Sequence, residues 1–206
     1  MKWSLRFAQL VAGLCVFGLG AALMVRVHLG LDPWNVFHQG LASRTVLSLG
    51  TISILSGIVV MLLWIPLRQK PGLGTICNIL LIGLSMDLFL WLIPDIEGWP
   101  LRIAGLIAGL VLTGLGTAAY IGAGMGTGPR DGLMLGLNRK FGWSIRISRM
   151  LVEVVVLISG WLLGGVVGVG TVAFALGIGP LVQFFLPWFQ RAPVARKADE
   201  AVRVPQ

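Results

Sequence analysis

Residues 3–22, WSLRFAQLVAGLCVFGLGAA, recur 96 residues later as residues 99–118, WPLRIAGLIAGLVLTGLGTA. The alignment continues without a gap, and about 29 of the 88 positions from residue 3 to residue 90 are identical to their counterparts. Self-similarity of this extent at one fixed spacing indicates an internal duplication. We therefore predict two homologous halves, residues 1–97 and residues 98–190.

The composition places both halves in a lipid bilayer. Hydrophobic residues make up 56% of the 206 residues and charged residues only 12%, and the mean hydropathy is +0.90. A soluble domain has an apolar fraction of roughly 45–50%, and about 18 consecutive apolar residues are enough for a membrane span. Apolar runs between Gly, Pro and charged residues predict an all-α membrane protein with about six transmembrane helices. These spans are Phe7–Val27, Ser48–Leu67, Leu73–Ile93, Ile103–Ile121, Ile147–Leu163 and Gly170–Phe189.

The odd number of spans in each half predicts the topology. After three spans the second copy enters the membrane from the side opposite to the first, so the repeats are expected to be inverted. With the N-terminus in the cytoplasm, 13 of the 16 Lys and Arg residues fall inside, as the positive-inside rule requires. We predict two inverted three-helix repeats in the bacterial plasma membrane, with both termini cytoplasmic. Residues 191–206 are predicted to be a basic, disordered cytoplasmic tail.

A short segment between the first and second span of each half is too polar to span and too apolar for a loop. In the first half, Asp32 and Pro33 are typical of an N-cap and a first helical residue, and an amphipathic stretch follows. In the second half, a helix is expected to begin at the matching Pro129. Each half is therefore predicted to contain a short amphipathic or re-entrant helix.

The starts of these two helices form the predicted substrate site. A helix N-terminus exposes unpaired N–H groups and the positive end of a dipole, and in inverted-repeat transporters such half-helices meet near the membrane midplane. The predicted substrate-binding residues are Asp32, Asn35, Arg130, Asp131 and the intramembrane carboxylate Asp87. Their mixed charges suggest a zwitterionic or amphipathic small molecule. Structural or hinge roles are expected for Pro33, Pro129, Gly126, Gly128, Gly168 and Gly170.

Alternative interpretations stay open for these residues. The two short helices can lie flat on opposite membrane surfaces, with Asp32 and Asp131 only complementing the helix dipoles. Asp87 can be a structural carboxylate held by a hydroxyl or an arginine of another helix. Glu153 has Arg149 one turn earlier, and this i,i+4 spacing favours a simple ion pair.

The sequence lacks the residue patterns of enzymes and metal sites. It contains no Ser-His-Asp set, phosphate loop or HExxH motif, and its two Cys and two His residues have no ligand spacing. The basic residues are spread over short connections rather than over one face, which argues against nucleic acid. We expect no enzymatic activity, no cofactor, no metal and no nucleic-acid partner. The expected partners are the lipid bilayer and a small-molecule substrate, and a homodimer is left open.

Three motifs resemble the bacterial YczE/YyaS/YitT-type membrane proteins. They are residues 30–34, GLDPW, residues 124–132, GMGTGPRDG, and residues 164–171, GGVVGVGT, in order at matching points of the duplication. The resemblance implies a multi-pass membrane protein, and some members of this family look like small-molecule exporters. Two functions are therefore predicted. One is a small secondary transporter or exporter that works by alternating access. The other is a non-transporting membrane scaffold or regulator of a partner enzyme or pathway.

Overall fold

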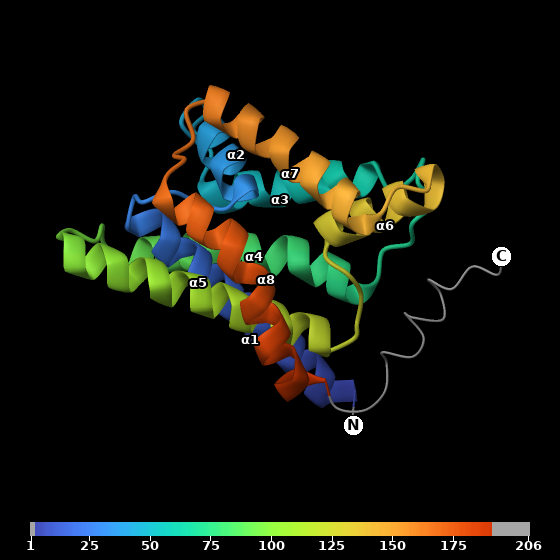
Figure 1. Cartoon of the computed structure of the whole chain (residues 1–206). Coiled ribbons are helices and arrows are strands. Elements are labelled where there is room, and N and C mark those ends of the chain that lie inside the picture. The colour runs from blue at the N-terminus through green and yellow to red at the C-terminus, as the bar shows by residue number, and fades with distance from the viewer. Residues whose placement is uncertain (1–2, 191–206) are drawn as a thin grey trace.

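The computed structural model describes residues 3–190, which form eight α-helices and no strand. The helices are α1 (Trp3–Arg26), α2 (Pro33–Ala42), α3 (Leu49–Leu62), α4 (Leu73–Leu92), α5 (Trp99–Gly122), α6 (Pro129–Phe141), α7 (Ile145–Leu162) and α8 (Val169–Phe189). Helices α1, α4, α5 and α8 form one layer, and α2, α3, α6 and α7 lie over it (Figure 1). The predicted all-α fold is confirmed, and the predicted tail at residues 191–206 lies outside the described residues.

The helices repeat with the spacing of the duplication. Each of α5 to α8 begins 96 residues after its counterpart among α1 to α4. Local sequence explains the shared starts, because Pro33 and Pro129 occupy the first position of α2 and α6, where proline loses no hydrogen bond. Ser48 and Ser144 cap α3 and α7 by accepting an N–H from the first turn.

Four helices, α1, α4, α5 and α8, are long and apolar enough to cross a membrane. The spans predicted over residues 48–67 and 147–163 are not confirmed by these criteria. Helix α3 has 14 residues and is about 21 Å long, which is shorter than the hydrocarbon core of about 30 Å. Helix α7 has 18 residues but carries Arg146, Arg149 and Glu153.

The first helices of the two halves, α1 and α5, cross antiparallel through glycines. A Cβ added at Gly13 would lie 3.0 Å from the Gly116 carbonyl oxygen, and one added at Gly116 would lie 2.6 Å from that of Gly13. Gly20 and Gly109 face each other in the same way, at 2.7 and 2.9 Å. Because Gly109 is the counterpart of Gly13 and Gly116 that of Gly20, the two contacts exchange under the duplication. The small residues permit the close approach of the two helices.

The bend before each short helix is hydrogen-bonded to the other half, again by a pair of contacts that are equivalent under the duplication. The Gly170 N–H at the start of α8 donates to the Leu29 carbonyl oxygen at 2.7 Å. The Gly74 N–H at the start of α4 donates to the Met125 carbonyl oxygen at 2.9 Å. Residues 170 and 125 are the counterparts of residues 74 and 29. Each half therefore holds the approach to the short helix of the other.

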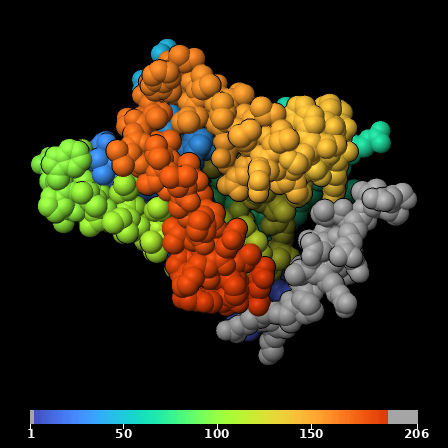
Figure 2. Space-filling view, in the orientation of Figure 1, coloured from blue at the N-terminus to red at the C-terminus, as the bar shows by residue number. Residues whose placement is uncertain are grey.

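Large apolar side chains cover the outer surface. On α7, Trp161 is 63% exposed and Leu162 69%, and on α8, Leu176 is 74% exposed and Phe184 61%. Figure 2 shows the face formed by α6, α7 and α8. An exposed apolar surface of this extent is unusual for a protein in water and is expected where lipid chains are the solvent. The chain is therefore a membrane protein.

Candidate functional site

A cavity of about 280 Å³ lies where α2 and α6 begin, and all eight helices of residues 3–190 contribute to its wall. Small-molecule sites in proteins commonly have volumes of roughly 300–1,000 Å³, so the cavity is near the lower end of that range. Its charged lining residues are Asp32, Arg130, Asp131, Arg149 and Glu153. The lining also includes the polar residues His38, Ser53, Ser56, Asn78, Thr117, Tyr120 and Gln183.

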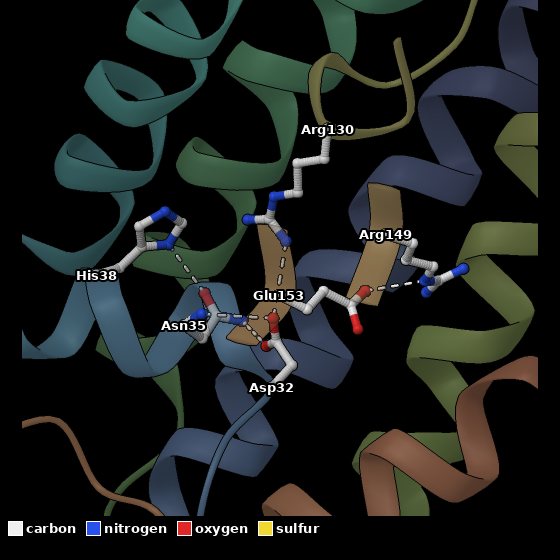
Figure 3. Close-up of polar contacts among 6 residues, drawn as sticks. All are labelled: Asp32, Asn35, His38, Arg130, Arg149 and Glu153. Atoms are coloured by element: carbon white, nitrogen blue, oxygen red, sulfur yellow. Dashed lines mark hydrogen bonds and ion pairs between the residues drawn. The ribbon is translucent and has the colours of Figure 1, made fainter. Parts of the chain in front are cut away.

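Asp32 starts a buried chain of hydrogen bonds along α2. Its carboxylate accepts the backbone N–H of Asn35 at 3.3 Å and the Asn35 side-chain amide at 2.5 Å. Because a carboxylate only accepts, the Asn35 amide nitrogen points to Asp32 and its oxygen faces His38 Nδ1, 3.2 Å away (Figure 3). That oxygen also only accepts, so Nδ1 carries the proton of the neutral ring and Nε2 is a bare acceptor.

Helix α6 reaches across to α2 through the first side chain after its proline. The Arg130 Nη1 lies 3.7 Å from Asp32 Oδ1, and the guanidinium lies over the Trp34 ring, 4.7 Å from its centroid. Arg130 is the counterpart of Trp34 in the duplication, so these equivalent positions of the two halves are in contact. The next residue, Asp131, accepts the Tyr120 phenol O–H at 3.1 Å.

Helix α7 adds an ion pair to the same wall. The Arg149 Nε donates to Glu153 Oε1 at 2.9 Å, one turn apart on α7 (Figure 3). The predicted i,i+4 pair is therefore present. Both side chains line the cavity, so the pair belongs to the candidate site as well as to the helix surface.

The structure brings together four of the five predicted substrate-binding residues. These are Asp32, Asn35, Arg130 and Asp131, at the adjoining starts of α2 and α6. Asn35 lies behind the wall and holds Asp32 and His38 in position rather than lining the cavity. Whether these residues bind a substrate stays a prediction.

Asp87 lies apart from the other four. Its carboxylate accepts the Ser48 hydroxyl at 2.5 Å and the Gly50 backbone N–H at 2.7 Å, so it binds the exposed N–H groups at the start of α3. This arrangement is the structural alternative, a carboxylate held by a hydroxyl of another helix. The counterpart of Asp87 in the second half, Gln183, lines the cavity instead.

The predicted structural residues all lie where the chain turns into a helix. Pro33 and Pro129 begin α2 and α6, and Gly128 and Gly168 are the N-caps of α6 and α8. Gly126 has a φ of 133°, which side chains rarely adopt. Gly170 donates to the bend before α2. These contacts fix the approach to the cavity, and a hinge role stays a prediction.

The predicted substrate-binding residues did not include the lining residues His38, Tyr120, Arg149 and Gln183. Of these, Arg149 was expected only as the ion-pair partner of Glu153. One available signal is the comparison of the two halves at equivalent positions. Arg149 replaces Ser53 of the first half, and Glu153 replaces Gly57. Charges that occur in only one copy of a duplicated membrane segment are expensive to bury and therefore point to a site.

Comparisons with known proteins identify the family of the chain. The model of a family of unknown function, DUF6198, matches residues 4–187. An uncharacterized protein of Haemophilus influenzae is 42% identical over 184 residues, covering 89% of this chain and 84% of that protein. The uncharacterized membrane protein YczE of Bacillus subtilis is 33% identical over 189 residues, covering 91% and 86%. The uncharacterized protein YyaS of the same organism is 28% identical over 183 residues, covering 87% and 91%. The resemblance drawn from the three sequence motifs is thus confirmed. No solved structure matches the chain.

Proposed function

We propose that this chain, which belongs to the DUF6198 family, is a small secondary transporter that moves a small molecule by alternating access. The observation that carries the proposal is the meeting of two short helices, one from each half, at a single cavity. Sites of this kind, built from discontinuous helices at the interface of two inverted repeats, are characteristic of secondary transporters. The contact between Trp34 and its counterpart Arg130 supports a site at the axis between the repeats.

In the proposed topology, six helices cross the membrane and α2 and α6 re-enter it from opposite faces. The antiparallel crossing of α1 and α5 supports the inverted orientation, because the two are equivalent helices. The short α3 is compatible with a crossing position because one of its faces packs on the protein while Leu55, Val59 and Leu62 are exposed as a lipid-facing surface would be. After α3, Trp64 Nε1 donates to the Pro129 carbonyl oxygen at 3.0 Å. Irregular backbone at membrane depth is tolerated where protein surrounds it.

We propose that the cavity opens on the side of Tyr120 and Val182. These residues of α5 and α8 line it, whereas their counterparts Met24 and Met86 do not and are packed in apolar clusters. In the proposed topology, the open end faces the cytoplasm, and the chain near the end of α5 is visible between α6 and α8 in Figure 2. Alternating access would exchange these two packings between the halves.

Thiol labelling from both sides of the membrane tests the proposal. Ser56→Cys places a thiol in the cavity wall, in a background in which Cys15 and Cys77 are replaced by serine. A membrane-impermeant thiol reagent should label this residue in right-side-out and in inverted vesicles, because both states of a transporter are visited. Thr45→Cys and Lys140→Cys, both exposed in loops or at a helix end, should each be labelled from one side only. Labelling of Ser56→Cys from a single side would overturn the proposal.

A non-transporting scaffold or regulator of a partner enzyme is the second candidate. The observation that favours it is that two of the three cavity carboxylates are already paired with arginines, so the wall is largely satisfied without a ligand. A scaffold predicts one-sided labelling of Ser56→Cys together with retained regulation of its partner. A homodimer remains a prediction in either case.

A further inference from the structure

The charges in the cavity wall do not balance. Three carboxylates and two guanidiniums line it, and each guanidinium has a partner: Arg130 pairs with Asp32 at 3.7 Å and Arg149 with Glu153 at 2.9 Å. Asp131 receives only the neutral Tyr120 phenol. With every group in its ordinary ionised form, the wall therefore carries one uncompensated negative charge. Asp131 is partly buried, and a carboxylate charge withdrawn from water without a counter-ion is costly. A cationic ligand would supply that counter-ion.

Two further polar atoms of lining residues lack a partner within residues 3–190. They are His38 Nε2 and Trp34 Nε1, in side chains whose residues are 1% and 7% exposed. The Asp32 and Asn35 bonds leave His38 Nε2 as an acceptor, and the Trp34 indole N–H can only donate. A ligand that satisfies both atoms needs an N–H or O–H donor and a neutral oxygen acceptor.

Part of the remaining wall is apolar. Phe17 of α1, Phe174 and Ile178 of α8 and Ile82 of α4 also line the cavity. Such surfaces favour a ligand with an organic body over a hydrated metal ion, since burial of apolar area is favourable. Aromatic rings also attract a cation that lies over their faces.

We propose that the cavity binds a small organic ammonium ion that also carries a hydroxyl or carbonyl oxygen, with the Asp131 carboxylate as its counter-ion. The ammonium group binds Asp131. His38 Nε2 and Trp34 Nε1 are covered in this structure, so they become the acceptor and the donor for the ligand once the side chains over them move. If the proposed transport function holds, this ammonium ion is the class of substrate that is transported; the inference rests on the proposed function to that extent. Binding itself can be measured without transport.

The test uses four compounds with one phenyl-ethane skeleton and the purified full-length protein. The probe, 2-amino-1-phenylethanol, has both the ammonium and the hydroxyl group. 2-Phenylethylamine lacks the hydroxyl, 1-phenylethane-1,2-diol lacks the charge, and 2-hydroxy-2-phenylacetate has the opposite charge. Calorimetry should show binding in the order probe, amine, diol, with the diol at least tenfold weaker than the probe and no binding of the anion. Diol or anion binding as tight as that of the probe would overturn the proposal.

Asp131→Asn keeps the shape of the side chain and removes its charge, so the probe should bind at least tenfold more weakly while the diol is unaffected. Asp95→Asn is the control. It removes an exposed carboxylate that does not line the cavity and should leave probe binding unchanged. If Asp131→Asn does not fold, the four compounds on the unmodified protein carry the test, because only the probe and the amine offer a cation to the carboxylate. Unchanged probe affinity in Asp131→Asn, or diol binding as tight as amine binding in the unmodified protein, would overturn the proposal.

The two proposals fail differently. A probe that binds through Asp131 while Ser56→Cys is labelled from one side only leaves the binding site standing and removes transport. Two-sided labelling without charge-dependent binding leaves the transporter standing and removes the ammonium substrate.

Discussion

Helices α2 and α6 occupy equivalent places and have the same backbone entry, yet their side chains differ in charge. The proline at the start is shared, but Asp32, the cap of α2, corresponds to Gly128, and Asn35 corresponds to Asp131. The first helix is satisfied by its own side chains, whereas the second sends its charges across to other helices. Backbone symmetry thus builds the cavity, and side-chain asymmetry gives the cavity its chemistry.

The crossing of α1 and α5 shows the opposite behaviour. There the equivalent glycines have retained both the backbone contact and the residue type, because any added atom would meet a carbonyl oxygen or an N–H group of the facing helix. A close helix crossing restricts both copies in the same way. Mutations at equivalent positions should therefore have equal effects at the crossing and unequal effects at the short helices.

The largest inequality is expected between Asp32→Ala and Gly128→Ala. Asp32→Ala removes the cap of α2 and leaves the half-buried Arg130 guanidinium without its partner, which we expect to lower the free energy of unfolding by about 3–5 kcal/mol. Gly128 has a φ of −60°, and a Cβ there would lie 3.3 Å from Asp131 Oδ2, so alanine should be tolerated with a small adjustment. Chemical unfolding in detergent micelles measures both. Equal losses would show that the cap and ion pair do not stabilise α2.

Equal effects are expected for Gly20→Ala and Gly116→Ala, which are counterparts at the crossing. The added Cβ would lie 2.7 Å from the Gly109 carbonyl oxygen in one case and 2.6 Å from that of Gly13 in the other. Each variant should lose about 1–3 kcal/mol of stability through overpacking. Gly179→Ala, where nothing lies within 4 Å, is the matched control and should be at least as stable as the parent protein. A difference of more than about 1 kcal/mol between the two crossing variants would contradict the equivalence of the two contacts.

Much of this arrangement could be predicted from the sequence because it follows from the duplication and from local signals. Pro33 and Pro129 fixed the starts of both short helices, and the opposite orientation of the copies predicted that Asp32 and Arg130 would meet. The binding of Asp87 to Ser48 could not be predicted, because the two lie 39 residues apart and on different helices. The same holds for the bond between Tyr120 and Asp131, which depends on how α5 packs against α6.

Asp87 and its counterpart Gln183 provide the next comparison. Asp87→Asn should weaken two bonds at the start of α3 and cost about 1–2 kcal/mol of stability, while probe binding in the cavity stays unchanged. Gln183→Ala removes a side chain that lines the cavity and should alter probe affinity with little change in stability. Thermal unfolding and calorimetry on the same preparations separate the two effects. Loss of probe binding in Asp87→Asn would show that the Asp87 carboxylate belongs to the binding site after all.

The smallest effect is expected at Asp95, which lies between α4 and α5, because its charge is paired and exposed whereas that of Asp131 is enclosed. Its carboxylate accepts a hydrogen bond from Arg26 Nη1 and faces His28 Nε2, both at 3.0 Å, and the side chain is 57% exposed.

The pH dependence of this pairing gives the test. The hydrogen bond with His28, and next the one with Arg26, lower the pKa of the Asp95 carboxyl. A lowered pKa in the folded state means that the ionised form contributes stability above the unfolded-state pKa. That contribution is lost as the pH falls through the folded-state pKa. Solvent screens an exposed pair, so Asp95→Asn should change the melting temperature only slightly at pH 7. The two proteins should converge as the pH falls through the folded-state pKa of Asp95, which lies below its ordinary value. Melting curves recorded from pH 7 downward measure this difference. A loss at pH 7 as large as that of Asp32→Ala would show that the pairing of Asp95 stabilises the protein as much as the cap and ion pair of Asp32 do.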